Sequence, residues 1–324
     1  IGKGKTNSVL KLVGKILAVA AAVFCTFAAI GMSGVQASKI SDVATAQIPL
    51  DPMVTSIIVG VVVAAILAVI ILGGIDLSVG SIIALSGCVA AGCVSRYELP
   101  QAAAIIAGLM VGVLVGMFNG LVISLTTIPP FIVTLATMNV AKGLAYVYTG
   151  GSPVRVVTKE WQFIGAGYIG IFPTPVIILV VVLIATAIIM NKTKLGRHIY
   201  AVGGNPLAAT FSGISTAKVK FIVHTYSGLM AGLAGVVLAS RMYSGQPTAG
   251  DGAEMDAIAA VVVGGTSMSG GSGKIGGMII GGLIIGVLNN GLNLLNVNSF
   301  WQYVVKGIVI LLAVLLDFFR NKKK

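Results

Sequence analysis

Few residues of this chain could do chemistry, and the first is an aspartate set between two apolar runs. Asp76 stands in the segment GGIDLSVGS, residues 73–81, among glycines and serines. A carboxylate there can accept hydrogen bonds from the unpaired backbone N–H groups that begin a helix. We therefore predict that Asp76 is the cap of a helix beginning just after it, and that the glycines form a tight turn.

A second segment that could bind a ligand is the glycine-rich GGSGKIGG, residues 270–277. Its glycines match the spacing G-x-G-x-x-G of dinucleotide-binding turns, but no strand–helix–strand unit surrounds them. A nucleoside-triphosphate loop is excluded as well, because Met268 replaces its first glycine and Ile275 replaces the Ser or Thr that follows its lysine. We read the segment as a turn, and we expect no catalytic residue and no ATPase on this chain.

Metal-binding chemistry is not expected either. Cys25, Cys88 and Cys93 all lie in apolar runs, where cysteine acts as a small packing residue. His198 and His224 are far apart and have no partner at ligand spacing.

The elements that must position these residues are membrane helices. The chain is 57% hydrophobic and 9% charged, whereas soluble domains carry about 25% charged residues. We predict an all-α, polytopic integral membrane protein with about ten transmembrane helices, some of them short re-entrant or broken segments. The expected spans are 12–31, 52–73, 79–94, 102–126, 130–149, 172–190, 221–240, 255–267, 275–294 and 302–316. The first is expected to stay as a helix, because its roughly 20 apolar residues exceed the 7–15 of a signal-peptide core.

The charge distribution predicts the orientation of these spans. The net charge is +12, but the basic residues lie in loops and tails and form no face interleaved with aromatic residues, so no nucleic-acid partner is expected. With ten spans and both termini in the cytoplasm, most Lys and Arg residues fall inside, as the positive-inside rule requires. Asp76 is then expected at the cytoplasmic boundary, because a charge at mid-membrane costs about 2.5–3.5 kcal/mol.

Several long segments resemble the ribose-type permeases of bacterial ATP-binding-cassette importers, the family shared with branched-chain amino-acid permeases. The likeness runs in unbroken order from about residue 55 to the C-terminus. The segments are GGIDLSVGSIIALSG (73–87), IPPFIVTLATMNVAKGLAYVYTGGSPV (128–154), TKLGRHIYAVGGNP (193–206), SGQPTAGDGAEMDAIAAVVVGGTSMSGGSGKIGG (244–277) and LNNGLNLLNVNSFWQYVVKGIVILLAVLLD (288–317).

The resemblance implies a membrane-spanning permease subunit of an ATP-driven monosaccharide importer, with ribose as the first substrate, that forms the translocation pathway by alternating access. It implies a single transmembrane permease domain over 1–324 in the bacterial inner membrane. It also implies a homodimer, or a pair with a close homologue, together with an extracytoplasmic sugar-binding protein and a cytoplasmic ATP-binding-cassette ATPase. ATP and Mg²⁺ would be used by that ATPase, and this chain would hold no cofactor.

Three other functions remain open. A branched-chain amino-acid permease shares the architecture, although the GGIDLSVGS and QPTAGDGAEMDAIAAVVVGGTS segments favour the sugar branch. A stand-alone ion-coupled carrier is disfavoured because such carriers usually place several ionisable groups inside their spans. A structural or regulatory membrane protein is the third.

The resemblance also assigns an ATPase-docking loop at about 191–219, with a short helix in GGNPLAATFSGI, residues 203–214. We expect a glycine turn, a helix start at an Asn-Pro pair and a small apolar face. Relatives commonly have an acidic residue at the position of Leu207, which argues against a salt bridge there. The alternative is a plain amphipathic connector. The docking residues are Gly203, Gly204, Asn205, Pro206, Leu207, Ala208, Ala209 and Phe211.

Two further groups of residues are expected to touch partners or substrate. Asp251, Glu254 and Asp256 form an acidic lip that receives the binding protein, or else a solvated loop with capping acids. Phe131, which follows two prolines, is our first choice for a gate in the pathway. The polar pathway candidates are Asn119, Thr134, Asn139, Asn289, Asn290 and Asn293. Gly282 and Gly286 have the small-xxx-small spacing of closely packed helices.

Overall fold

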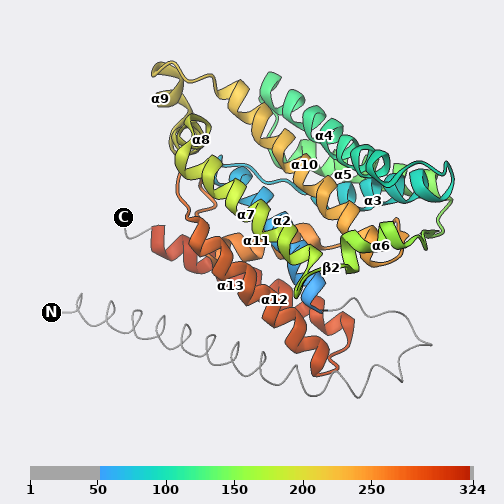
Figure 1. Ribbon diagram of the computed structural model, residues 1–324. Helices are drawn as coiled ribbons and strands as arrows, with labels where there is room; N and C mark the ends of the chain where they lie inside the picture. The colour runs from blue at the N-terminus through green and yellow to red at the C-terminus, as the bar shows by residue number, and fades with distance from the viewer. Residues whose placement is uncertain (1–51, 322–324) are drawn as a thin grey trace.

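The computed structural model describes residues 52–321, and helices make up most of that range (Figure 1). The expected span at 12–31 lies outside the described residues. Only four strands of two residues each occur in the described part, and they form two antiparallel pairs. β1 Val154–Arg155 pairs with β4 Ser244–Gly245, and β2 Tyr168–Ile169 pairs with β3 Phe172–Pro173. The predicted all-α membrane fold is confirmed.

The helices follow the apolar runs closely. They are α2 Pro52–Ile71, α3 Val79–Ser95, α4 Gln101–Leu125, α5 Pro130–Thr149, α6 Lys159–Ala166, α7 Thr174–Lys192, α8 Lys194–Gly204, α9 Pro206–Phe211, α10 Thr216–Arg241, α11 Ala253–Val263, α12 Ile275–Leu294 and α13 Ser299–Asn321. Five of them, α4, α5, α7, α10 and α12, are long and apolar enough to cross a membrane. Shorter apolar stretches lie in α2, α3 and α13.

The run at 255–267 does not form a full span. α11 has 11 residues, which is about 16 Å at 1.5 Å per residue and roughly half of a hydrocarbon core. Gly250 and Gly252, both at positive φ, keep the preceding chain non-helical, and Gly264 and Gly265 follow the end of the helix. This run was expected to be short or broken by glycine, and the structure agrees: the helix ends at Val263, before the end of the expected run.

An extended segment precedes α11 and lies along α3. Within residues 242–252, Gly245 lies against Cys88 in the middle of α3, and Gly250 lies against Gly80 at its start. After α11, the backbone N–H of Gly271 donates to the carbonyl oxygen of Ile71, the last residue of α2 (2.8 Å). The segment and the short helix together thus reach from the middle of α3 to the end of α2.

The two halves of the described chain repeat one order of elements. Each has a long helix, an extended segment carrying an aspartate, a shorter helix and two more long helices: α2–α5 in the first half and α10–α13 in the second. The first helix of each half packs into the other half, because α10 contacts α3 and α4 whereas α2 contacts α11 and α12. In Figure 1, α10 accordingly lies beside α4 and α3. The halves are interleaved.

The contact between α4 and α10 depends on glycines at every fourth position of α4. The stripe consists of Gly108, Gly112, Gly116 and Gly120. A Cβ atom at Gly116 would lie 2.5 Å from the carbonyl oxygen of His224, and one at Gly120 would lie 2.7 Å from that of Phe221. These are backbone-to-backbone contacts that only glycine allows, as is common between membrane helices.

The glycine contact expected at Gly282 is absent. No described atom lies within 4 Å of the point where its Cβ would stand. On the same helix, α12, the glycine at 281 makes the close contact instead, against the carbonyl oxygen of Ala260 in α11. The other glycine of the expected pair, Gly286, is buried in α12.

Candidate functional site

Asp76 lies at the centre of a buried polar network between α3 and α10. Its Oδ1 accepts hydrogen bonds from the backbone N–H (3.0 Å) and hydroxyl (2.6 Å) of Ser78, and its Oδ2 accepts one from the hydroxyl of Ser227 (2.8 Å). The N-cap position of α3 is Ser78, and Asp76 is 1% exposed. Asp76 therefore accepts an N–H at the start of α3 as expected, but the N-cap residue is Ser78, and a bond to the middle of α10 satisfies the other carboxylate oxygen inside the protein. The expected place of Asp76 at the cytoplasmic boundary stays a prediction.

Two of the predicted pathway residues belong to the same network. Asn119 of α4 is fully buried and donates from Nδ2 to the Ser78 hydroxyl (3.0 Å). Thr134 of α5 is also fully buried, and its hydroxyl accepts from Leu77 N–H (3.2 Å) and contacts the carbonyl oxygen of Ile75 (3.2 Å). Their side chains hold the extended segment 72–78 in place, and a position on the pathway stays a prediction for both.

A matched pair of substitutions in α5 tests this role. Thr134→Val leaves the buried N–H of Leu77 without its acceptor, and we expect a loss of about 1–3 kcal/mol in stability. Thr137→Val, also buried, removes only a bond to the carbonyl oxygen of Val133 in the same helix, so we expect a smaller loss. Thermal unfolding in detergent measures both. Equal melting temperatures for the two variants would contradict the role of Thr134.

Two other pathway candidates lie on the surface of α5. Phe131 is exposed in its first turn, and the exposed Asn139 donates only to the carbonyl oxygen of Leu135 in its own helix (3.0 Å). Neither residue lines the pocket that lies between α11 and α13. A gate at Phe131 stays a prediction.

The three acidic residues of the expected lip have different environments. Asp251 is exposed and pairs with Lys142 of α5 (3.0 Å). Glu254 is buried, with its carboxylate against Gly80 at the start of α3. Asp256 is buried and pairs with Lys306 of α13 (2.9 Å). Only Asp251 lies at the surface, so a lip of three exposed acids was wrong: α11 turns its other two acids towards neighbouring helices.

The candidate asparagines of α12 lie near this ion pair. Asn289 is buried and donates to Oδ2 of Asp256 (2.9 Å), the oxygen that Lys306 also contacts. Asn293 accepts from Nε2 of Gln302 across the turn between α12 and α13 (2.9 Å). Asn290 is half-buried on α12. We therefore place Asn289 and Asn293 in contacts between helices.

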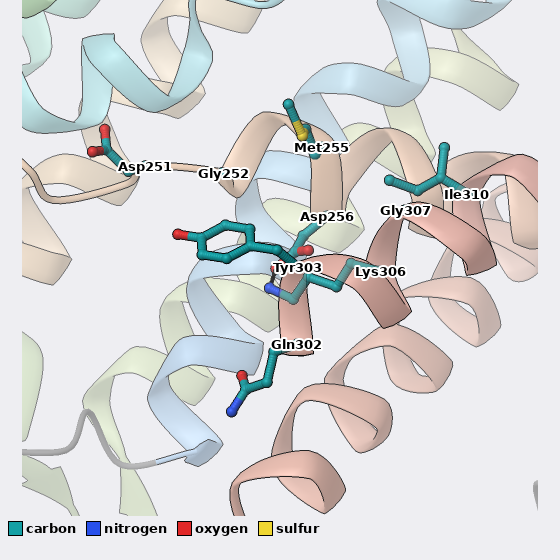
Figure 2. A pocket seen from close by; sticks show the side chains of 9 residues that line it. All are labelled: Asp251, Gly252, Met255, Asp256, Gln302, Tyr303, Lys306, Gly307 and Ile310. Atoms are coloured by element: carbon teal, nitrogen blue, oxygen red, sulfur yellow. Dashed lines mark hydrogen bonds and ion pairs between the residues drawn. The ribbon is translucent and has the colours of Figure 1, made fainter. Parts of the chain in front are cut away.

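A pocket of about 270 Å³ opens beside the Asp256–Lys306 pair, between α11 and α13 (Figure 2). Its polar lining comes from Asp251, Asp256, Gln302, Tyr303 and Lys306. The sequence alone did not single out the three α13 residues as site residues. The available signal was Lys306 itself, a lysine inside the apolar stretch Trp301–Leu315.

The docking segment forms two short helices at one end of the molecule (Figure 1). Asn205 separates α8 from α9, and its side chain caps α9 by accepting from the N–H of Ala208 (3.0 Å), with Pro206 in the first turn as expected. Leu207 is 72% exposed and Phe211 is 90% exposed. These two residues, four apart, form the apolar surface of α9 that a partner could cover.

The predicted docking face needs two corrections. Ala208 is exposed, but Ala209 is buried in the core and unavailable to a partner. Gly203 and Gly204 are the last residues of α8 and do not form the turn. Gly203 instead allows α8 to touch the end of α2, since its Cβ would collide with the carbonyl oxygen of Ile71.

The end of α8 packs against the end of α2 and against the loop that follows α11. Gly203 lies against Ile71 and Gly271, and the Ile71 carbonyl accepts the N–H of Gly271. The Tyr200 hydroxyl donates to the carbonyl oxygen of Gly273 (3.0 Å), and burial raises the pKa of Tyr200, so the phenol stays a neutral donor. A displacement of α8 and α9 would therefore reach the segment that carries Asp76.

Comparisons with known proteins bear on what these features serve. Residues 48–314 match the family described as branched-chain amino acid transport system / permease component. The chain is 51% identical over 251 residues to the ribose import permease protein RbsC of Bacillus subtilis (strain 168), which covers 77% of this chain and 78% of that protein. It is 47% identical over 262 residues to the protein of that name in Escherichia coli (strain K12), covering 79% and 80%.

A third relative is named for a different sugar. The chain is 41% identical over 275 residues to the L-arabinose transport system permease protein AraH of Escherichia coli (strain K12), covering 82% of this chain and 80% of that protein. No solved structure matches the chain.

Proposed function

The chain belongs to the permease-component family of branched-chain amino acid transport systems, and on that premise we propose that it is the membrane-spanning permease subunit of an ATP-driven monosaccharide importer with a ribose-like substrate. The observation that carries the proposal is the 51% identity to a ribose import permease over 77% of this chain. The sugar branch is favoured over an amino-acid permease because the relatives reported above are named for ribose and L-arabinose.

We propose that the end of the molecule with α8 and α9 faces the cytoplasm, as do both termini, in the bacterial inner membrane. Basic residues gather around that end, which agrees with the positive-inside rule. They are Lys192, Lys194, Arg197, Lys218, Lys220 and Lys274. The chain would act with a second copy or a close homologue, and a sugar-binding protein would reach the opposite face.

The energy source in this proposal is a separate ATPase subunit. It would use ATP and Mg²⁺, and the permease would hold no cofactor and no catalytic residue. α9 is the contact: Leu207 and Phe211 would enter an apolar groove of the ATPase, since exposed apolar side chains at an interface are stabilised by burial. The connection from Gly203 to Ile71 would carry its movement to the membrane helices.

A double variant, Leu207→Ser with Phe211→Ser, tests docking. The tagged chain is purified from its native membranes in mild detergent, and its ATPase subunit is identified and quantified by mass spectrometry. Loss of two buried apolar side chains corresponds to about 3 kcal/mol or more, so we expect the recovered ATPase to fall at least tenfold.

Its matched control is Ile169→Ser with Ile171→Ser, which changes two exposed apolar residues around the β2–β3 hairpin, away from α9. We expect that variant to keep the ATPase. Recovery of the chain without any ATPase, together with sugar uptake into vesicles that contain no ATP, would contradict the proposed function.

A further inference from the structure

We propose that the pocket between α11 and α13 is a monosaccharide-binding site on the transport pathway. The inference rests on the proposed function and extends it to particular residues: Tyr303, Gln302 and the Asp256–Lys306 pair. Figure 2 shows these side chains around one opening, with Lys306 and Asp256 meeting between the two helices.

The Lys306 side chain lies deep within an apolar helix. Lys306 follows the start of α13 at Ser299 by 306 − 299 = 7 residues, which is about 10 Å along the helix axis. It lies inside the apolar stretch Trp301–Leu315 and is only partly buried. Ionisable side chains at such a depth are expensive, and they usually face a water-filled cavity through which a polar ligand passes. The pocket beside Lys306 is a cavity of this kind.

Both carboxylates that line the pocket are already paired with lysines. Asp256 is paired with Lys306, and Asp251 at the edge of the pocket is paired with Lys142. Neither lining carboxylate is therefore left without a cation for an ionic ligand to supply. An amino acid would need an uncompensated cation for its carboxylate and an uncompensated anion for its ammonium group. A neutral polyhydroxy ligand needs neither and requires only donors and acceptors.

The pocket is lined by both hydrogen-bond donors and hydrogen-bond acceptors. Nε2 of Gln302 is already occupied by the side chain of Asn293 and the carbonyl oxygen of Val297, both at 2.9 Å, and these bonds orient its amide. The Tyr303 hydroxyl has no hydrogen-bond partner among the described residues and is directed towards the Asp251 side of the pocket in Figure 2. Each sugar hydroxyl both donates and accepts, so it can pair with the tyrosine and with the fixed carboxylates.

The pocket also has an aromatic side chain in its wall. Tyr303 is 63% exposed, and its ring forms one side of the pocket. An aromatic ring with a polar tip suits a ligand that has one apolar C–H face and a rim of hydroxyl groups. The volume of about 270 Å³ lies just below the 300–1,000 Å³ usual for small-molecule sites, as expected for a ligand the size of a pentose.

Transport by the complete importer in lipid vesicles, with its ATPase and binding protein, tests this site. We expect Tyr303→Leu to lower D-ribose uptake about tenfold while ATP hydrolysis stimulated by the binding protein stays within about twofold of the unmodified importer. Tyr303→Phe keeps the ring and should lose less. The matched control is Trp301→Leu, an equally exposed aromatic residue of α13 that does not line the pocket, and it should leave uptake unchanged.

A binding measurement that does not depend on turnover accompanies transport. Met255→Cys places a thiol in the exposed part of the lining, and its rate of labelling by a maleimide, corrected for the unmodified chain, reports access to the pocket. We expect D-ribose to slow labelling and L-leucine to leave it unchanged. Protection by L-leucine alone would overturn the sugar assignment.

The results distinguish a failure of the proposed function from a failure of the proposed binding site. An unmodified importer that moves no D-ribose with ATP would contradict the proposed function, and this site with it. An unmodified importer that moves D-ribose, combined with full uptake by Tyr303→Leu and no protection of Met255→Cys, would overturn only the site.

Discussion

A leucine at Gly112 is expected to prevent the chain from accumulating as folded protein. A Cβ atom at this position would lie 2.8 Å from the Cα of Gly232 and would collide with the carbonyl oxygen of Gly228. Both neighbours are backbone atoms of α10, so no side-chain rotation relieves the overlap and the two helices must separate. Overpacking of a core costs about 1–3 kcal/mol when side chains can adjust, and more is expected where they cannot.

The matched control is Gly282→Leu. It adds the same side chain to a glycine in another apolar helix, α12, where no described atom lies within 4 Å of the new Cβ. Fluorescence-detected size exclusion of both variants as fusion proteins measures the yield of monodisperse protein. We expect less than a tenth of the unmodified yield for Gly112→Leu and nearly all of it for Gly282→Leu. Equal yields would contradict the contact between α4 and α10.

The second large effect is expected for Asp76→Ala. The substitution removes the acceptor of three hydrogen bonds, which the N–H and hydroxyl of Ser78 and the hydroxyl of Ser227 donate; the Ser78 hydroxyl keeps only the bond that it accepts from Asn119. Hydrogen bonds to a charged group contribute about 1.5–3 kcal/mol each and are not additive, so we expect a loss of about 2–4 kcal/mol in stability. Asp76→Asn keeps one acceptor oxygen and should lose less.

Thermal unfolding in detergent measures this effect, with Glu160→Ala as the control, since Glu160 is an exposed carboxylate in the first turn of α6. A lowered melting temperature for Asp76→Ala and an unchanged one for Glu160→Ala are expected. If both variants melt together with the unmodified chain, Asp76 does not hold α3 against α10.

The sequence predicts the long helices because their signal is local. Runs of apolar residues bounded by Pro130 or by Gly150 define α5 without knowledge of its neighbours. α11 is predicted less well at its ends. The apolar run was placed at 255–267, but the helix begins at Ala253, directly after Gly252 at positive φ, and ends at Val263, before Gly264 and Gly265.

The buried polar groups could be named from the sequence but not placed. Ser227, a partner of Asp76, is 151 residues away, and Lys306, the partner of Asp256, is 50 residues away. No local pattern predicts such pairs, because they depend on how helices distant in the sequence pack together. The glycine stripe of α4 is different: its four glycines recur at every fourth position and were visible in the sequence.

The interleaved halves have a consequence for biogenesis. During synthesis, the translocon receives α2–α5 well before α10 exists. Until α10 arrives, Asp76 lacks Ser227, and the glycine stripe of α4 has no helix to cover it. During this interval the Asp76 carboxylate would keep only its hydrogen bonds to Ser78, and its other oxygen would face lipid or water. An insertase or the translocon itself would have to shield the Asp76 carboxylate until α10, Thr216–Arg241, enters the bilayer and packs against α3 and α4.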